Sequence, residues 1–213
     1  PHRRDLEMRR HEYVDKWRLC QITNGDLRQG GVAEAMEGVD VVIALSKPGP
    51  GTILPEWVSR MNKDAIVFAC ANPVPEIWPW EALEAGARIV ATGRSDFPNQ
   101  VNNSLGFPGI FRGALDVRAK TITDEMCFAA AEALAEFIGD DLDDEHLLPS
   151  MEDWQVFARE AAAVGMKAQE QGVARLTKSY DELYEHALLM IGRSRNLTKT
   201  MMAEGFIEPV PEE

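Results

Sequence analysis

The sequence predicts an α/β fold: the second half of a doubly wound parallel sheet, followed by C-terminal helices. Short apolar runs at 40–45, 65–70 and 88–92 are separated by segments of helix length. Continuous apolar runs are typical of strands buried on both faces, and strands that alternate with helices pair in parallel through right-handed crossovers. Because a three-stranded parallel sheet seldom stands alone, we expect half of a six-stranded Rossmann-type sheet.

Helices are expected around these strands and near the N-terminus. Segments 32–36, 53–61 and 79–86 have helical character, and Gly86 suits a left-handed cap at the end of the last one. Another helix is expected over residues 7–20. Its candidate core positions recur at helical spacing and are Tyr13, Trp17 and Cys20.

Beyond the third strand the sequence predicts further helices. Pro108 is expected to kink or restart a helix within 101–117. Thr123 is a good N-cap for the next helix, Ser150 is expected to cap another, and residues 180–191 form a last one. The residues expected to face the core in these three helices are apolar and share helical spacing: Phe128, Ala131, Leu134, Ala135, Ile138; Trp154, Phe157, Ala158, Ala161, Val164; Leu183, Ala187, Met190, Ile191.

The composition is acidic and excludes two classes of partner. Lys and Arg total 22 against 35 Asp and Glu, which gives a formal net charge of −13. A nucleic-acid-binding protein needs a basic surface that displaces counterions from phosphates, and an anionic membrane surface repels an acidic chain. We therefore expect neither nucleic acid nor membrane among the partners.

The cysteines and the chain termini indicate an intracellular setting. Cys20, Cys70 and Cys127 lie far apart and form no CxxC pair, so neither a disulfide framework nor a zinc site is expected. A reducing cytoplasm fits this usage. No apolar stretch approaches the roughly 20 residues of a membrane span, and no signal peptide opens the chain. Because the first residue is not methionine, we expect a processed product or a fragment.

Polar or Gly/Pro-rich segments follow each predicted strand, and Asn72 is the strongest single candidate among them. Ligands of open α/β sheets bind outside the carboxyl ends of the strands. Asn72 directly follows a buried strand and precedes Pro73, which favours an extended backbone at the asparagine. Its amide offers both a donor and an acceptor, although an Asn-Pro pair also starts turns.

A second candidate region carries four side-chain amides ahead of a predicted helix: Asn99, Gln100, Asn102 and Asn103. Amides can hold anions and hydroxyls without changing charge with pH. A helix N-cap accounts for one of these asparagines, but not for four amides. Lys47, after the first strand, is either a cofactor contact or an exposed loop lysine.

Familiar catalytic signatures are missing from the sequence. The four histidines are scattered without metal-ligand spacing, and no Ser-His-Asp set, GxGxxG turn or P-loop is legible. No constellation of residues therefore supports a reaction by itself.

Three segments together resemble the malic enzymes, in their shorter bacterial and archaeal form. They are Ser46-Lys-Pro-Gly49, residues 68–78 (FACANPVPEIW) and residues 91–116 (ATGRSDFPNQVNNSLGFPGIFRGALD). The run at 91–116 is long and highly specific. The similarity is strong from about residue 29 to 138 and weaker on either side.

The resemblance implies oxidation of (S)-malate by NAD or NADP with Mg²⁺ or Mn²⁺, followed by decarboxylation to pyruvate and CO₂. In that family a lysine base, a tyrosine, the acidic metal ligands and the Gly-rich phosphate loop all precede the region seen here. The resemblance thus implies no catalytic residue and no metal ligand in this chain. We expect it to be inactive without the missing N-terminal region, and its residues do not distinguish NAD from NADP.

The resemblance also implies binding roles for particular residues. Asn72, Asn102 and Asn103 are expected to bind the substrate. Asn72 and Asn103 are expected to contact the cofactor as well, beside a loop that contains Ser46 and Lys47. Neutral amides would orient a malate dianion rather than transfer its protons.

The same resemblance divides the chain and places it in an assembly. Residues 1–138 are expected to form a partial NAD(P)-binding Rossmann domain, residues 139–207 a C-terminal helical extension, and residues 208–213 a disordered tail. The family also implies a homo-oligomer, and we expect a cytoplasmic location.

Two other hypotheses stand beside this one. A non-catalytic nucleotide-binding or interaction module that retains the fold would show no activity even with the N-terminal region present. A dehydrogenase with a related cofactor domain would act on another substrate, an alternative that the specific run at 91–116 disfavours.

Overall fold

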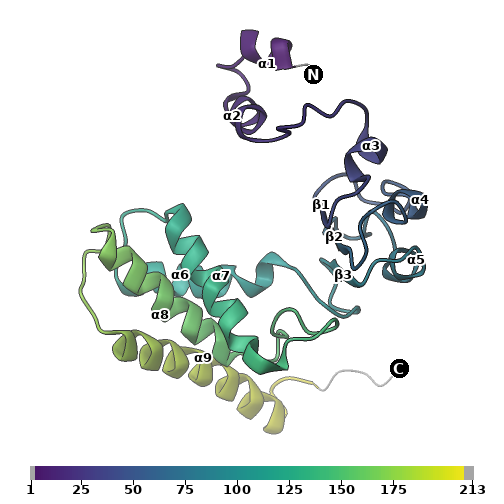
Figure 1. Ribbon diagram of the computed structural model, residues 1–213. Helices are drawn as coiled ribbons and strands as arrows, with labels where there is room; N and C mark the ends of the chain where they lie inside the picture. Colours follow the sequence, from purple (N-terminus) through teal and green to yellow (C-terminus); the bar gives the residue numbers. More distant parts are fainter. Residues whose placement is uncertain (1–2, 209–213) are drawn as a thin grey trace.

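The computed structural model describes residues 3–208, with the side chains described from residue 6 onward, and Figure 1 shows three parts along the chain. We call residues 3–31 the N-terminal arm, residues 32–100 the sheet lobe and residues 101–208 the helical lobe. The arm contains α1 (Arg3–Met8) and α2 (Val14–Ile22).

The sheet lobe contains the predicted parallel sheet. Its three strands lie in the order β1-β2-β3, and each neighbouring pair is parallel. The register pairs Ala44 with Ala69 and Ala69 with Thr92, so all three strands end at the same edge. The elements of the lobe are α3 (Val32–Met36), β1 (Val41–Ala44), α4 (Pro55–Val58), β2 (Ile66–Ala69), α5 (Pro79–Glu84) and β3 (Ile89–Thr92). The α/β class and the parallel arrangement are confirmed.

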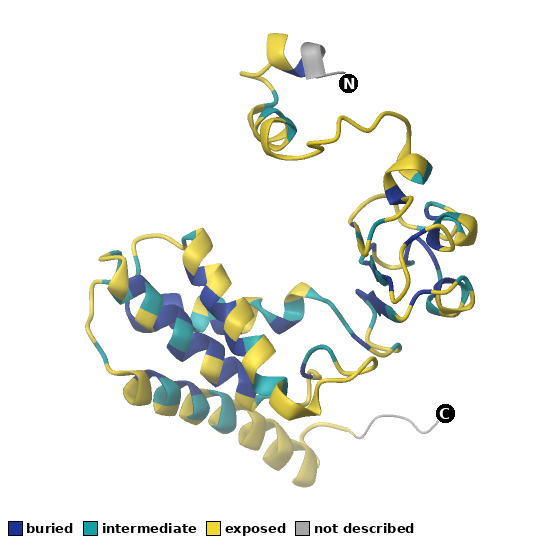
Figure 2. Ribbon diagram, viewed as in Figure 1, coloured by how far each residue is buried: buried dark blue, intermediate teal, exposed yellow. Residues whose placement is uncertain are grey.

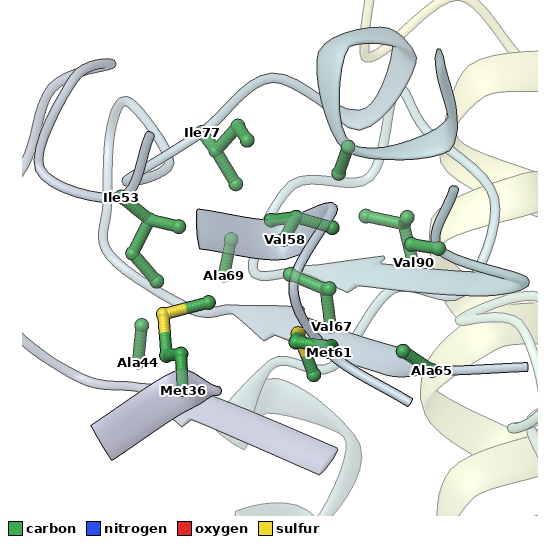
Figure 3. Close-up of a cluster of buried hydrophobic side chains, with 12 residues drawn as sticks. Met36, Ala44, Ile53, Val58, Met61, Ala65, Val67, Ala69, Ile77 and Val90 are labelled. Carbon is green, nitrogen blue, oxygen red and sulfur yellow. The ribbon is translucent and has the colours of Figure 1, made fainter. Parts of the chain in front are cut away.

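One face of the sheet carries the core of this lobe. Figure 3 shows Val67, Ala69 and Val90 of the strands against Met36 of α3 and Val58 of α4. These side chains alternate with residues on the opposite face, as the two-residue period of a strand requires. The glycine expected to cap α5, Gly86, has a φ of +106°, which is the left-handed conformation.

The opposite face of β1 is exposed, which corrects the prediction of burial on both faces for this strand, whereas β3 is buried on both faces at Val90 and Ala91. The exposed fraction of Ile43 is 63%, and that of Leu45, which directly follows the strand, is 77%. Helices α3, α4 and α5 all contribute to the single cluster on the other face. A doubly wound sheet covers its second face with helices from its other half, and the part of the chain described here has no helix in that position.

The helical lobe is built around α8 (Gln155–Glu170), whose buried residues Figure 2 shows surrounded by neighbouring helices. Gly113 and Gly165 allow close approach, because a Cβ at Gly113 would lie 2.4 Å from the carbonyl oxygen of Ala161. The remaining elements of the lobe are η1 (Asn103–Leu105), α6 (Phe107–Asp116), α7 (Asp124–Ile138), η2 (Gly139–Asp141) and α9 (Tyr180–Ala203). Pro108 stands in the first turn of α6 and therefore restarts the helix rather than kinking it.

The single helix predicted at 7–20 is wrong. A turn at residues 9–12 separates α1 from α2, and no residue of α2 is buried. Tyr13, Trp17 and Cys20 are only half-buried. Helical spacing places these side chains on one face, but a core position also requires a second element packed on that face.

The predicted core face of α7 is wrong for three of its five residues, whereas Leu134 packs against the helical core as predicted and Ile138 is half-buried. Phe128 is 64% exposed, and Ala131 and Ala135 are exposed as well. The buried residues are Met126, Ala129, Ala130 and Ala133. Helix α8 packs closely against α7, and a close contact favours the face with small side chains over the face with a bulky ring.

The boundaries of the last helices differ from those predicted. Helix α8 begins at Gln155, and Ser150 instead accepts a hydrogen bond from the backbone N–H of Glu152 in the preceding turn, at 3.2 Å. Helix α9 runs to Ala203, and Met190 on it is exposed. Phe157, Ala158, Ala161, Val164, Leu183 and Ala187 are buried as predicted.

The division of the chain at residues 138 and 139 stays a prediction. Helices α7 and α8 lie on either side of that boundary and pack against each other, as do α6 and α8. Of the predicted tail, Glu208 is exposed, and residues 209–213 lie outside the described residues.

Candidate functional site

A buried carboxylate joins the loops at the ends of β1 and β2. Glu76 is fully buried, and one carboxylate oxygen, Oε1, accepts a hydrogen bond from the backbone N–H of Ser46 at 2.8 Å and lies 3.3 Å from the Ser46 hydroxyl. The other oxygen, Oε2, accepts from the backbone N–H of Ala71 at 3.0 Å. These N–H groups lie just beyond the strands, where the sheet no longer supplies acceptors. Glu76 thereby fixes two strand-end loops relative to each other.

Sequence reasoning missed Glu76, although a signal was present. A glutamate between Pro75 and Ile77, shortly after a buried strand, stands in an apolar setting where a charge requires partners. The same carboxylate affects Cys70: burial, together with the nearby negative charge of Glu76, raises the pKa of the Cys70 thiol.

Asn72 lies at the carboxyl end of the sheet, as predicted from its place after β2. It is exposed, and its peptide bond to Pro73 is cis. The Asn72 amide packs against Gly93, which follows β3: a Cβ on Gly93 would lie 2.7 Å from Nδ2 and 3.0 Å from Oδ1 of Asn72. Only a glycine at position 93 leaves room for the amide in this position.

Asn102 contacts the same glycine. Its Nδ2 donates a hydrogen bond to the carbonyl oxygen of Gly93 at 2.8 Å, and its Oδ1 accepts from the backbone N–H of Ser104 at 2.9 Å. The second bond caps η1. Two of the predicted site residues, Asn72 and Asn102, therefore meet at Gly93 although they are far apart in the sequence.

The other amides of the 99–103 cluster have different environments. Asn99 is buried, and its Nδ2 donates to the carbonyl oxygens of Val90 at 3.2 Å and Asp144 at 2.7 Å. Its Oδ1 accepts from the backbone N–H of Leu147 at 2.9 Å, so Asn99 holds a loop of the helical lobe against β3. Asn103 starts η1 and is exposed.

Ser46 and Lys47 occupy the loop after β1. Both are exposed, and the backbone of Ser46 is held by Glu76. The carbonyl oxygen of Lys47 accepts a hydrogen bond from the hydroxyl of Thr52 at 3.2 Å. The structure places this loop at the same edge of the sheet as Asn72, because parallel neighbouring strands end side by side.

The groups gathered at this edge suit the orientation of a ligand. Asn72 is exposed and offers a neutral donor and acceptor, whereas both ends of the Asn102 amide are engaged with Gly93 and Ser104. Asn103 and Lys47 are exposed residues of the neighbouring segments. Within residues 3–208, no group of three or more His, Cys, Asp or Glu side chains could hold a metal ion. In the same described part, no helix combines the length and the apolar character that crossing a bilayer requires.

Comparison with known proteins identifies the family of the chain. The family model described as "Malic enzyme, NAD binding domain" matches residues 32–169. The bifunctional malic/malolactic enzyme of Bacillus subtilis is 48% identical over 168 residues, which cover 78% of this chain and 40% of that protein.

Two solved structures extend the match to the fold. The malic enzyme of Pyrococcus horikoshii has a TM-score of 0.80 and 53% identity, over 84% of this chain and 41% of that one. The malic enzyme of Entamoeba histolytica has a TM-score of 0.93 and 46% identity, over 99% of this chain and 43% of that one. The chain thus spans about 40% of the length of these relatives. It belongs to the malic enzyme family, of which it carries the NAD-binding domain.

Proposed function

We propose that this chain is the cofactor-binding portion of an enzyme that oxidises and decarboxylates (S)-malate to pyruvate and CO₂ with NAD or NADP. Asn72, Asn102 and Asn103 orient the substrate, and Asn72 and Asn103 also contact the cofactor. Ser46 and Lys47 line the cofactor from the loop after β1. The observation that carries the proposal is the meeting of Asn72 and Asn102 at Gly93, in a chain of this family.

The amides act by position in this proposal. A malate dianion and a nicotinamide ring present carboxylate oxygens, a hydroxyl and a carboxamide, and each of these groups pairs with a neutral amide. Correct alignment of two reactants removes much of the entropic barrier to their reaction, so a small displacement of an orienting group is expected to cost a large factor in rate.

We place the proton-transfer groups and the metal ligands outside this chain. The described residues offer no fitting metal site, and so no step through Mg²⁺ or Mn²⁺ is assigned to them. A tyrosine, a lysine and acidic ligands from the portion of the family sequence that this chain does not span complete the enzyme in our proposal. We expect the chain alone to be inactive, and the complete enzyme to be a cytoplasmic homo-oligomer.

The test uses the complete open reading frame that contains these residues. Reduction of NAD or NADP should depend on both (S)-malate and Mg²⁺ or Mn²⁺, and Asn103→Ala should lower kcat/KM by about tenfold or more. Asn196→Ala, an exposed asparagine on α9, is the matched control and should leave the rate unchanged.

Two outcomes would overturn the proposal in different ways. No malate-dependent reduction by the complete protein would favour the alternative of a non-catalytic module. Full activity in Asn103→Ala would leave the proposed reaction standing but would show that Asn103 does not bind the substrate or the cofactor.

A further inference from the structure

The loop that carries Asn72 is tied to the loop after β3 by one arginine. Arg94 directly follows Gly93, and its Nη1 donates a hydrogen bond to the carbonyl oxygen of Pro73 at 3.0 Å. Its Nε and Nη2 donate to the two carboxylate oxygens of Asp96 at 2.8 Å and 2.7 Å. All three guanidinium nitrogens are thus engaged, which fixes the plane of the group.

Aromatic rings support the guanidinium of Arg94. Its central carbon lies 5.4 Å from the ring centroid of Phe97 and 5.9 Å from that of Trp78. Trp78 in turn stacks on Trp80 with centroids 4.9 Å apart. Cations are attracted to aromatic faces at such distances.

The charge of Arg94 is already balanced within the chain. The bidentate contact neutralises it, and hydrogen bonding from Arg94 correspondingly lowers the pKa of the Asp96 carboxyl. An arginine that binds a ligand carboxylate or phosphate usually directs its two-pronged edge at that ligand. In Arg94 that edge faces Asp96, so the geometry favours a structural connection over anion binding.

We propose that Arg94 is a positioning residue that holds the Asn72 amide against Gly93, beside Asn102, by anchoring the carbonyl group of Pro73 to the loop after β3. The inference rests on the proposed function, because it concerns the site in which Asn72 orients substrate and cofactor. Arg94 and Gly93 are neighbours in the chain, as are Pro73 and Asn72. The hydrogen bond between Arg94 and Pro73 therefore joins the two residues that directly follow Gly93 and Asn72, and it holds these two contact partners together.

The kinetic test is a double-mutant cycle in the complete open reading frame. Arg94→Gln should lower kcat/KM for malate by roughly 10- to 100-fold, the range expected when an orienting group moves by about 1 Å. In an Asn72→Ala background the same change should cost less than about threefold, because the group that Arg94 positions is already gone. Independent, multiplicative effects of the two substitutions would overturn the proposal.

Two further variants separate positioning from folding. Arg88→Gln removes another arginine of this lobe that pairs with an aspartate. Its Nε lies 3.1 Å from both carboxylate oxygens of Asp144, and its loss should change kcat/KM by less than about twofold. In Arg94→Lys a single amino group replaces the three guanidinium nitrogens that bond Pro73 and Asp96. The kcat/KM of this variant should therefore lie between those of the wild type and Arg94→Gln. Equal losses in Arg88→Gln and Arg94→Gln would contradict a specific role for Arg94.

A crystal structure of the Arg94→Gln protein tests the positioning role of Arg94 without an activity measurement. The Asn72 amide should leave its contact with Gly93 while β2 and β3 stay in register. An unmoved amide would overturn the inference, whatever reaction the enzyme catalyses. Absence of malate-dependent turnover in the wild type, together with a displaced amide in the variant, would refute the proposed function and leave the positioning role intact.

Discussion

The sheet lobe and the helical lobe each bury a glutamate, and the two glutamates have opposite environments. Glu76 and Glu160 are both fully buried. Glu76 accepts hydrogen bonds from Ser46 and Ala71, whereas neither carboxyl oxygen of Glu160 has a hydrogen-bond partner. Burial without partners raises the pKa of Glu160 to about 8.

Secondary structure accounts for this difference. The N–H groups that Glu76 binds follow the last paired residues of β1 and β2 and are free to donate. Glu160 lies inside α8 and faces α6 at Gly109, where a Cβ would lie 2.4 Å from the Cβ of Glu160. Backbone N–H groups within a helix already donate to its own carbonyls. A buried carboxylate is therefore stabilising at strand ends and costly between packed helices.

Removal of Glu76 should have the largest effect on stability. Glu76→Ala removes the acceptor of the backbone N–H groups of Ser46 and Ala71, of which Ala71 is buried, and leaves the space of a fully buried side chain empty. We expect a loss of about 4 kcal/mol in the free energy of unfolding. Urea denaturation measures this loss. Glu84→Ala, at an exposed position on α5, should change stability by less than about 0.5 kcal/mol. A similar loss of unfolding free energy in the two variants would show that the hydrogen bonds of Glu76 do not stabilise the sheet lobe.

Replacement of Glu160 should raise the free energy of unfolding rather than lower it, and the size of the increase should depend on pH. The folded-state pKa of about 8 lies above the usual 4.5, so the protonated form favours folding. This contribution is fully present below pH 4.5 and is lost as the pH rises through 8. Glu160→Gln cannot ionise and should be more stable than the wild type by about 3 kcal/mol at pH 9, with little difference at pH 5.

The measurement compares urea denaturation of wild type and Glu160→Gln at several pH values. Glu136→Gln, an exposed glutamate on α7, is the control and should show no such trend. A constant difference between wild type and Glu160→Gln from pH 5 to 9 would show that Glu160 is paired or hydrated in solution.

Close helix packing supplies a third test. A methyl group at Gly113 would approach the carbonyl oxygen of Ala161 and the side chain of Val164, so Gly113→Ala should destabilise the chain by about 2 kcal/mol. Gly192→Ala on α9 meets no atom within 4 Å and should stabilise it by about 0.5 to 1 kcal/mol through helix propensity. A change in melting temperature of the same sign in the two variants would argue against the packing of α6 on α8.

The smallest expected effect concerns the cap of α7. The Thr123 hydroxyl accepts from the backbone N–H of Met126 at 3.2 Å and donates to Oε1 of Gln171 at 2.6 Å. Thr123→Ala should cost about 1 kcal/mol in the free energy of unfolding, and Thr123→Ser should recover most of it. No difference between the alanine and serine variants would mean that the hydroxyl is dispensable.

The sequence predicted local features well where a single residue type carries the physical reason. Gly86 takes the left-handed conformation, Pro108 starts a helix, and Thr123 caps one, because backbone geometry or one adjacent donor decides each case. Asn72 was also placed correctly at the end of a strand. The resemblance placed Asn72 and Asn102 at one site, but their contacts with Gly93 could not be predicted, because they join residues from different loops whose distance depends on the sheet register.

The amino-acid sequence by itself determined the three strands, their parallel arrangement, the caps at Gly86 and Thr123 and the family, since these follow from apolar runs, turn residues and specific motifs. Only the tertiary structure decided which face of α7 is buried, that Ile43 and Leu45 are exposed, and that Glu76 is satisfied while Glu160 is not. Burial and hydrogen-bond satisfaction depend on what packs against a residue. That neighbour comes from elsewhere in the chain, so no local pattern contains it.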